Sequence, residues 1–91
     1  MLYSGHARRE MLLEEFGIIS DSEVGEAMDS PELLEEYPED RPYPSCLLLG
    51  FTTAGRPLHV VAAYDEAGHE IVVVTVYHPD PDRWEDNRRR K

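Results

Sequence analysis

Three side chains in the second half of the sequence have the types needed to cleave RNA: Arg56, His59 and Tyr77. His59 interrupts an apolar segment, where a histidine is either buried and hydrogen-bonded or poised as a general acid or base. Arginine binds phosphate through paired N–H donors, and a tyrosine hydroxyl can supply a second proton. This combination suits cleavage by the 2′-hydroxyl of RNA.

A further pair, His6 and Glu10, is spaced by four residues. On a helix these side chains share one face, so the carboxylate can orient the imidazole, although a surface pair near a helix start fits the spacing equally. His69 and His78 are expected to be structural residues at a turn and a strand end. A metal site from His6, Glu10 and His59 has suitable ligand types, but no spacing supports it. We expect no metal and no cofactor.

Charge is distributed unevenly along the chain, which carries a net charge of −10. Residues 10–40 hold twelve acidic side chains and no lysine or arginine. Such a surface opposes non-specific nucleic-acid binding, because phosphate contact depends on basic residues that release counterions. The C-terminal tail is basic instead. The tail residues predicted to hold phosphate together with Arg56 are Arg83, Arg88 and Arg89.

Length and composition predict one globular domain over residues 1–91, since 41% of the residues are hydrophobic. The only cysteine, Cys46, allows no intrachain disulfide and no thiolate cluster for zinc. A reducing cytoplasm is therefore expected, and neither a signal peptide nor a membrane-spanning segment is recognisable. The absence of a phosphate-binding glycine loop, a zinc-protease motif and a nucleophile elbow argues against most nucleotide-dependent enzymes, metalloproteases and α/β-hydrolases.

Two helices are expected near the N-terminus. The first covers residues 6–16, with an apolar stripe on one side and Gly17 at its C-terminal end. The second covers residues 20–29, because Ser20 and Glu23 stand at capping-box spacing before an apolar stripe.

The remaining sequence is typical of strands joined by short connections. We predict an edge strand at 32–37, a proline-rich loop at 38–44, strands at 45–53, 56–64 and 69–78, and a short helix with a basic tail at 81–91. Connections this short require antiparallel pairing. The expected fold is α+β, with two N-terminal helices packed on one face of a three- to four-stranded antiparallel sheet.

Alternation assigns the strand residues to two faces of this sheet. A two-residue turn at Ala54-Gly55 would place one apolar set under the helices: Leu47, Leu49, Phe51, Leu58, Val60, Val72, Val74 and Val76. The opposite face would be open to solvent and would carry Leu48, Gly50, His59, Val61, Thr75 and Tyr77. We therefore expect the functional site on the open face.

Several segments resemble the domain-of-unknown-function 4258 family over nearly the whole chain, in both their order and their spacing. They are Ser4-Gly-His-Ala7, Tyr37-Pro-Glu-Asp-Arg-Pro-Tyr-Pro-Ser-Cys46, Gly55-Arg-Pro-Leu-His-Val-Val61 and Thr75-Val-Tyr-His-Pro-Asp-Pro-Asp-Arg-Trp84. Proteins of this family look like members of the wider RelE/ParE-type toxin superfamily. The resemblance implies two helices on one face of an antiparallel sheet, and a small zinc-binding antitoxin with paired Cys-x-x-Cys motifs as partner.

Two main functional hypotheses follow, beside a third in which the chain is a stand-alone metal- or ligand-binding domain. In the first, the chain is the toxin-like component of a type II toxin–antitoxin pair and a metal-independent messenger-RNA endonuclease, acting on free or ribosome-bound RNA. His59 and Tyr77 would then be the acid and base, with His6 and Glu10 as neighbours. The resemblance also leaves a gyrase target open. In the second, the same fold is a non-catalytic protein-binding module.

Overall fold

A five-stranded sheet, two helices and a terminal hairpin form the computed structural model, which describes residues 1–91. The elements are β1 (Leu2–Tyr3), α1 (Gly5–Leu13), α2 (Asp21–Ala27), β2 (Glu32–Tyr37), β3 (Ser45–Phe51), β4 (Pro57–Asp65), β5 (Glu70–Tyr77), β6 (Trp84–Glu85) and β7 (Arg89–Arg90). Neither helix is long and apolar enough to cross a membrane.

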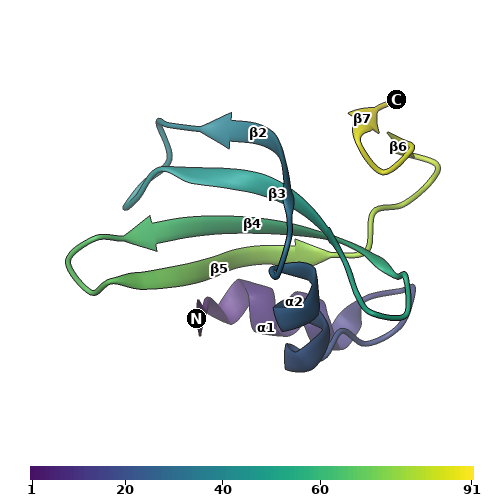
Figure 1. Cartoon of the computed structure of the whole chain (residues 1–91), viewed down its shortest axis with the longest axis horizontal. Helices are drawn as coiled ribbons and strands as arrows, with labels where there is room; N and C mark the ends of the chain where they lie inside the picture. Colours follow the sequence, from purple (N-terminus) through teal and green to yellow (C-terminus); the bar gives the residue numbers. More distant parts are fainter.

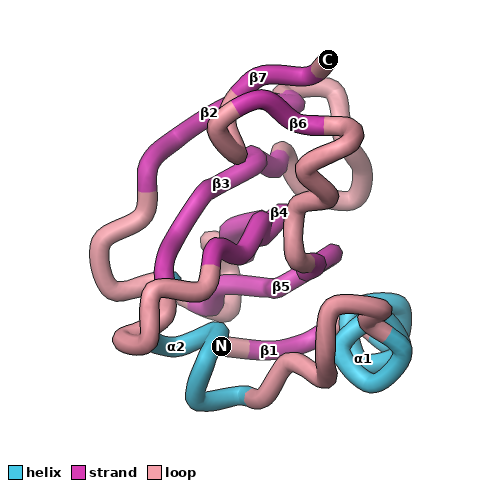
Figure 2. Tube along the Cα trace, turned by 90° about the vertical axis from the view of Figure 1, so that its right-hand side faces the viewer, coloured by secondary structure: helices cyan, strands magenta, loops and turns pink.

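The main sheet is mixed, in the order β1-β5-β4-β3-β2 (Figures 1 and 2). Strands β2 to β5 form an antiparallel meander, and β1 pairs in parallel with β5 through Leu2↔Val72 and Tyr3↔Val73. The expectation of three to four antiparallel strands is therefore wrong in one respect. A strand of two residues is too short to show the alternation by which strands are recognised in a sequence.

Both helices begin next to their capping residues, and both end earlier in the sequence than predicted. The Ser4 hydroxyl accepts the Ala7 N–H at the start of α1, and Ser20 and Glu23 form the complete capping box of α2. Helix α1 ends at Leu13 because Glu14 is extended, and Gly17 then adopts a φ of +112° in the following turn.

The β3–β4 turn differs from the expected one, and the difference exchanges the two faces of β3. Thr52 pairs with Arg56 around a three-residue loop, in which Gly55 has a φ of +87°. Leu48 therefore lies opposite Val60, and Leu49 lies opposite His59. Because side chains alternate between faces, one extra loop residue moves Leu47 and Leu49 to the His59 face.

The core lies between the helices and the other face of the sheet. It consists of the buried residues Ala7, Met11, Ile19, Val24, Ala27, Leu58, Val60, Ala62, Val73 and Val76. Helix α2 approaches β3 closely at Gly50, where an added Cβ would lie 2.0 Å from the Ala27 carbonyl oxygen. Only a residue without a side chain permits this packing.

Helix α1 also covers the edge of β5 that extends beyond β1. The Glu10 carboxylate accepts the Val76 N–H at 3.1 Å, and the Glu14 carboxylate accepts the His78 N–H at 3.2 Å. Four residues of helix rise about 6 Å and two residues of strand rise about 6.6 Å, so the two spacings match. These contacts satisfy edge groups that would otherwise be free to pair with another chain.

The segment after β5 forms a hairpin, so the predicted C-terminal helix is wrong. Asp86 and Asn87 have φ angles of 55° and 60°, and the Arg88 N–H donates to the Glu85 carbonyl at 3.0 Å. Positive φ at both central residues is typical of a type I′ hairpin turn, which asparagine and aspartate tolerate. Trp84 anchors this hairpin against the sheet face that had been predicted to be open.

Candidate functional site

His59 is fully buried between the sheet and the terminal hairpin. Its Nε2 lies 2.6 Å from the Asn87 carbonyl oxygen, and its Nδ1 lies 3.1 Å from the Tyr77 hydroxyl. Because a carbonyl only accepts, Nε2 carries the hydrogen, and the Tyr77 hydroxyl donates to Nδ1. The Trp84 ring meets the imidazole edge-on at 4.4 Å between centroids. Both ring nitrogens are thus occupied within the protein.

Burial sets the protonation of this pair. It lowers the pKa of His59, and it raises the pKa of Tyr77 to about 12. At neutral pH the imidazole and the phenol are therefore both uncharged, which fits the donor and acceptor roles assigned above. The sequence prediction places His59 and Tyr77 together correctly, but the hairpin covers the imidazole.

Arg56 lies on the helix side of the sheet and binds protein groups with its whole guanidinium. It donates to the Glu23 carboxylate at 3.1 Å, to the Gly17 carbonyl at 2.6 Å and to His78 Nδ1 at 3.2 Å. Further donations go to the Ile18 and Phe16 carbonyls. This residue ties the α1–α2 connection to the sheet, and the structure separates it from His59.

His6 and Glu10 form the predicted pair on α1, with 3.4 Å between His6 Nε2 and the carboxylate. The His6 side chain is largely exposed. Glu10 also binds the β5 edge, so this pair lies beside the sheet and not over the face that holds His59. No group of three or more histidine, cysteine or acidic side chains is arranged to hold a metal ion.

The arginines of the tail divide into paired and unpaired residues. Arg88 binds Glu32 at 3.0 Å, and Arg89 binds Glu85 at 2.8 Å. Arg90 binds Glu35, lowering the pKa of that carboxyl, and its guanidinium lies 4.6 Å from the Trp84 ring centroid. Two of the three predicted phosphate-binding tail residues are thus engaged internally, whereas Arg83 forms no ion pair.

A polar cleft of about 670 Å³ opens between the end of α1 and the hairpin. Tyr77 and Trp84 contribute aromatic edges to it, and Arg83, Arg90 and Lys91 contribute positive charge. The same cleft is lined by carboxylates, among them those of Glu14, Glu15, Asp80 and Asp82. Its charge is mixed, which weakens attraction for a polyanion.

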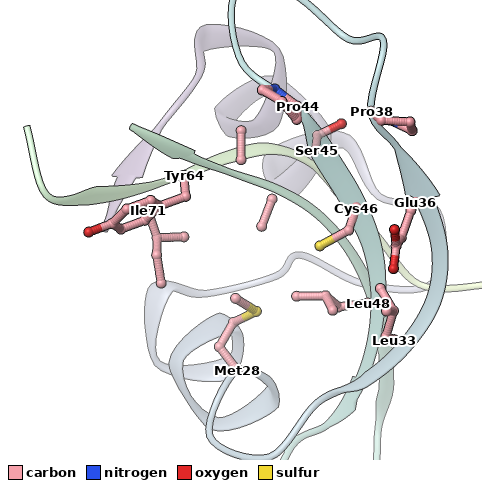
Figure 3. A pocket seen from close by; sticks show the side chains of 12 residues that line it. Met28, Leu33, Glu36, Pro38, Pro44, Ser45, Cys46, Leu48, Tyr64 and Ile71 are labelled. Atoms are coloured by element: carbon pink, nitrogen blue, oxygen red, sulfur yellow. The ribbon is translucent and has the colours of Figure 1, made fainter. Parts of the chain in front are cut away.

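An apolar groove of about 510 Å³ lies on the helix face of the sheet, over the half that α1 and α2 leave uncovered (Figure 3). Its lining comes from the end of α2, strands β2 to β5 and the β2–β3 loop: Met28, Leu33, Glu36, Pro38, Pro44, Ser45, Cys46, Leu48, Ala62, Ala63, Tyr64 and Ile71. Leu33, Tyr64 and Ile71 are 52%, 49% and 38% exposed. Exposed apolar side chains gathered in one concave surface are typical of a binding site.

A comparison with family models matches residues 3–78 to the family described as Domain of unknown function (DUF4258). The chain belongs to this family. No curated protein and no solved structure matched the chain. The DUF4258 match includes the groove and the residues from His6 to Tyr77, whereas the β6–β7 hairpin follows the matched segment.

The groove of this DUF4258 domain was missed by sequence reasoning because of the β3–β4 turn. With a two-residue turn, Leu48 belongs to the opposite face. Cys46, Leu48 and Ala62 share the groove face only in the observed register. The signal available in the sequence was Gly55, since glycine at the last position of a three-residue loop is common in hairpins.

Proposed function

We propose that this DUF4258 domain is a toxin-like protein-binding module whose partner occupies the apolar groove. The observation that carries the proposal is the groove itself, where Leu33, Tyr64 and Ile71 remain exposed around an apolar floor. Monomeric proteins seldom leave such concave apolar surfaces without a function.

The surroundings of His59, on the sheet face that the hairpin covers, argue against catalysis there. A general acid or base must reach the substrate, directly or through one water molecule. His59 is buried, and both of its ring nitrogens are bound within the protein. Arg56, the expected phosphate ligand, is fully used in holding the α1–α2 connection.

The arrangement of α1 and α2 on an antiparallel meander supports placing the chain near the RelE/ParE-type toxins, because the resemblance implies that arrangement. On this proposal the partner is a small zinc-binding antitoxin with paired Cys-x-x-Cys motifs. The product of the neighbouring reading frame is the first candidate to examine.

The test is co-expression of the chain with that candidate, followed by measurement of the dissociation constant of the purified pair. Ile71→Glu places a charge in the groove and is expected to weaken binding at least about tenfold. Leu13→Glu is the matched control, because Leu13 is exposed on α1 away from the groove. Equal affinities for Ile71→Glu and Leu13→Glu would rule out the groove as the interface.

Messenger-RNA cleavage is a second candidate function, favoured by the polar cleft. Single-stranded RNA stacks on aromatic side chains and follows positive charge, and the cleft offers the exposed Phe16 and Tyr77 beside Arg83 and Lys91. Induced expression without a partner should then arrest growth. Combined Arg83→Glu and Lys91→Glu substitutions should relieve the arrest, whereas Arg9→Glu, on α1, should not. A parent chain that leaves growth and cellular RNA unchanged would rule this candidate out.

A further inference from the structure

The groove lies where a third helix would complete the helix layer. Helices α1 and α2 lie together on one side of the sheet, and the groove begins beside Met28 at the end of α2 (Figures 1 and 3). Its floor is the same sheet face that forms the core elsewhere, through Leu48 and Ala62. An apolar sheet face is normally covered by a second layer, and that layer is absent here.

The shape of the groove suits a helix as its ligand. Cys46 and Ala62, which have small side chains, lie opposite each other on β3 and β4, the two strands between β2 and β5. Larger side chains stand at the two ends of the groove, Leu33 from β2 at one and Tyr64 with Ile71 from β4 and β5 at the other (Figure 3). An amphipathic helix presents a stripe of three to four apolar residues every two turns, which this surface can receive.

The surface around the groove is acidic. Glu36 lines it directly, and Asp29, Glu39 and Glu66 follow closely in sequence after lining residues. None of these four carboxylates forms an ion pair. Cys46 and Glu36 lie on neighbouring strands as register partners, so one carboxylate stands directly beside the apolar floor. Charge complementarity therefore favours a basic occupant.

An added strand fits the groove less well than a helix. The outer edge of β2 is unpaired, so an extended peptide could extend the sheet there. Such a strand would lie beyond Leu33 and would leave Cys46 and Ala62, on β3 and β4, uncovered. Only an element lying across the strands covers this floor.

We propose that the groove binds an amphipathic helix of a partner protein, with lysine or arginine residues flanking the apolar stripe. This inference rests on the proposed binding function and specifies the part of the partner that enters the groove. The helix would pack beside α2, and its basic residues would face Glu36 and the neighbouring carboxylates.

The test uses labelled synthetic peptides of about 18 residues, or about five helical turns, and fluorescence anisotropy with the full chain. One peptide has leucines at helical spacing with lysines elsewhere. A second has the same composition in scrambled order, a third has glutamate in place of lysine, and a fourth alternates leucine and lysine as a strand would. The first is expected to bind at least about tenfold more tightly than each of the others.

Two protein variants separate the groove from general attraction to an acidic surface. Ile71→Lys and Leu13→Lys change the net charge equally, but only Ile71 lines the groove. The helical lysine peptide should lose at least about tenfold in affinity for Ile71→Lys and less than about twofold for Leu13→Lys. Equal losses, or equal binding of the scrambled peptide, would overturn the inference, and tighter binding of the alternating peptide would replace it with strand addition.

The two proposals fail in different ways. If Ile71→Glu breaks the complex with the co-expressed partner but no helical peptide binds, the binding function stands and the helical occupant is wrong. If Ile71→Glu leaves that complex intact, the groove is not the interface and both proposals fall.

Discussion

At the scale of single residues, His59 joins the two halves of the molecule through hydrogen bonds. Its imidazole accepts from Tyr77 on β5 and donates to Asn87 in the hairpin. A buried polar group is tolerated only when it is bonded in this way. The residue that first suggested catalysis therefore stabilises the fold, and its chemistry should be visible in the stability of the protein.

Stability is expected to fall as the pH falls through the titration range of His59. Burial lowers the pKa of His59 below its ordinary value of 6.5, so below that pH the unfolded chain binds a proton that the folded chain does not. The free energy of unfolding should then decrease by at most about 1.4 kcal/mol per pH unit from this residue, until the folded-state pKa is reached. Urea unfolding at a series of pH values measures the slope.

Replacing the imidazole identifies its share of that slope. His59→Gln should flatten the pH dependence without abolishing it, because burial also lowers the pKa of His78. His69→Gln, in the exposed β4–β5 turn, should retain the full slope since His59 is still present. A His59→Gln slope equal to that of the parent would contradict the assignment.

At the scale of elements, the carboxylates of α1 act as hydrogen-bond partners for the edge of β5. Glu10→Ala leaves the Val76 N–H without its acceptor and should cost about 1 kcal/mol. Amide hydrogen exchange should accelerate at Val76 by about fivefold, since a tenfold change corresponds to about 1.4 kcal/mol. Glu15→Ala, at an exposed position beyond α1, is the control. Unchanged exchange at Val76 would show that the carboxylate is dispensable there.

Substitution of two glycines, Gly50 on β3 and Gly25 on α2, tests how closely α2 packs on β3. Gly50→Ala would place a Cβ 2.0 Å from the Ala27 carbonyl oxygen, and we expect a loss of about 3 kcal/mol or more. Gly25→Ala, in α2 itself, meets no atom within 4 Å and should gain about 0.5 to 1 kcal/mol through helix propensity. Thermal unfolding of both variants compares them directly. A neutral Gly50→Ala would mean that α2 can move away from the sheet without cost.

Local signals predicted the elements well and their mutual register poorly. The capping box at Ser20 and the strand alternation are properties of neighbouring residues, so the sequence displays them directly. The β3–β4 register depends on one residue of loop length, and that residue exchanges the two faces of β3. The predicted helix at 81–91 is a hairpin, and the signal for it was the Asp86-Asn87 pair, which is typical of a tight turn.

The candidate site was also predicted only where neighbouring strands determine it, and not where it depends on contacts distant in sequence. His59 and Tyr77 were placed together because their strands are neighbours in the sequence and their spacing sets the face. The bonds of Arg56 to the α1–α2 connection, which is distant in sequence, could not be inferred from spacing. The groove required both the β3 register and the position of α2, so it became visible only in three dimensions.

At the scale of the whole molecule, the two faces of the sheet are covered by different means. The helix face is buried by apolar packing, whereas the hairpin is held by Trp84, by the bond from His59 to Asn87 and by ion pairs to β2. Arg88 and Arg90 neutralise Glu32 and Glu35, so part of the acidic surface is compensated within the chain. Trp84 is the only large apolar anchor of this cover.

Truncation of that anchor should therefore affect the stability of the whole fold. Trp84→Ala removes a side chain that is 6% exposed and should cost about 3 to 5 kcal/mol in urea unfolding. Trp84→Phe keeps an aromatic ring against His59 and should cost less. If Trp84→Ala left the unfolding midpoint unchanged, the hairpin would be an independent appendage and not part of the cooperative unit.

The pairing of β1 with β5 and the docking of the hairpin also have a consequence for biosynthesis. Leu2 is synthesised before its partner Val72, so β1 can pair only after β5 has been made. His59 stays uncovered until Trp84 and Asn87 have been synthesised and can dock on it. Contacts so distant in sequence slow folding. The nascent chain thus passes through a stage in which this face of the sheet is uncovered, and a chaperone or the binding partner can reach it before the hairpin docks.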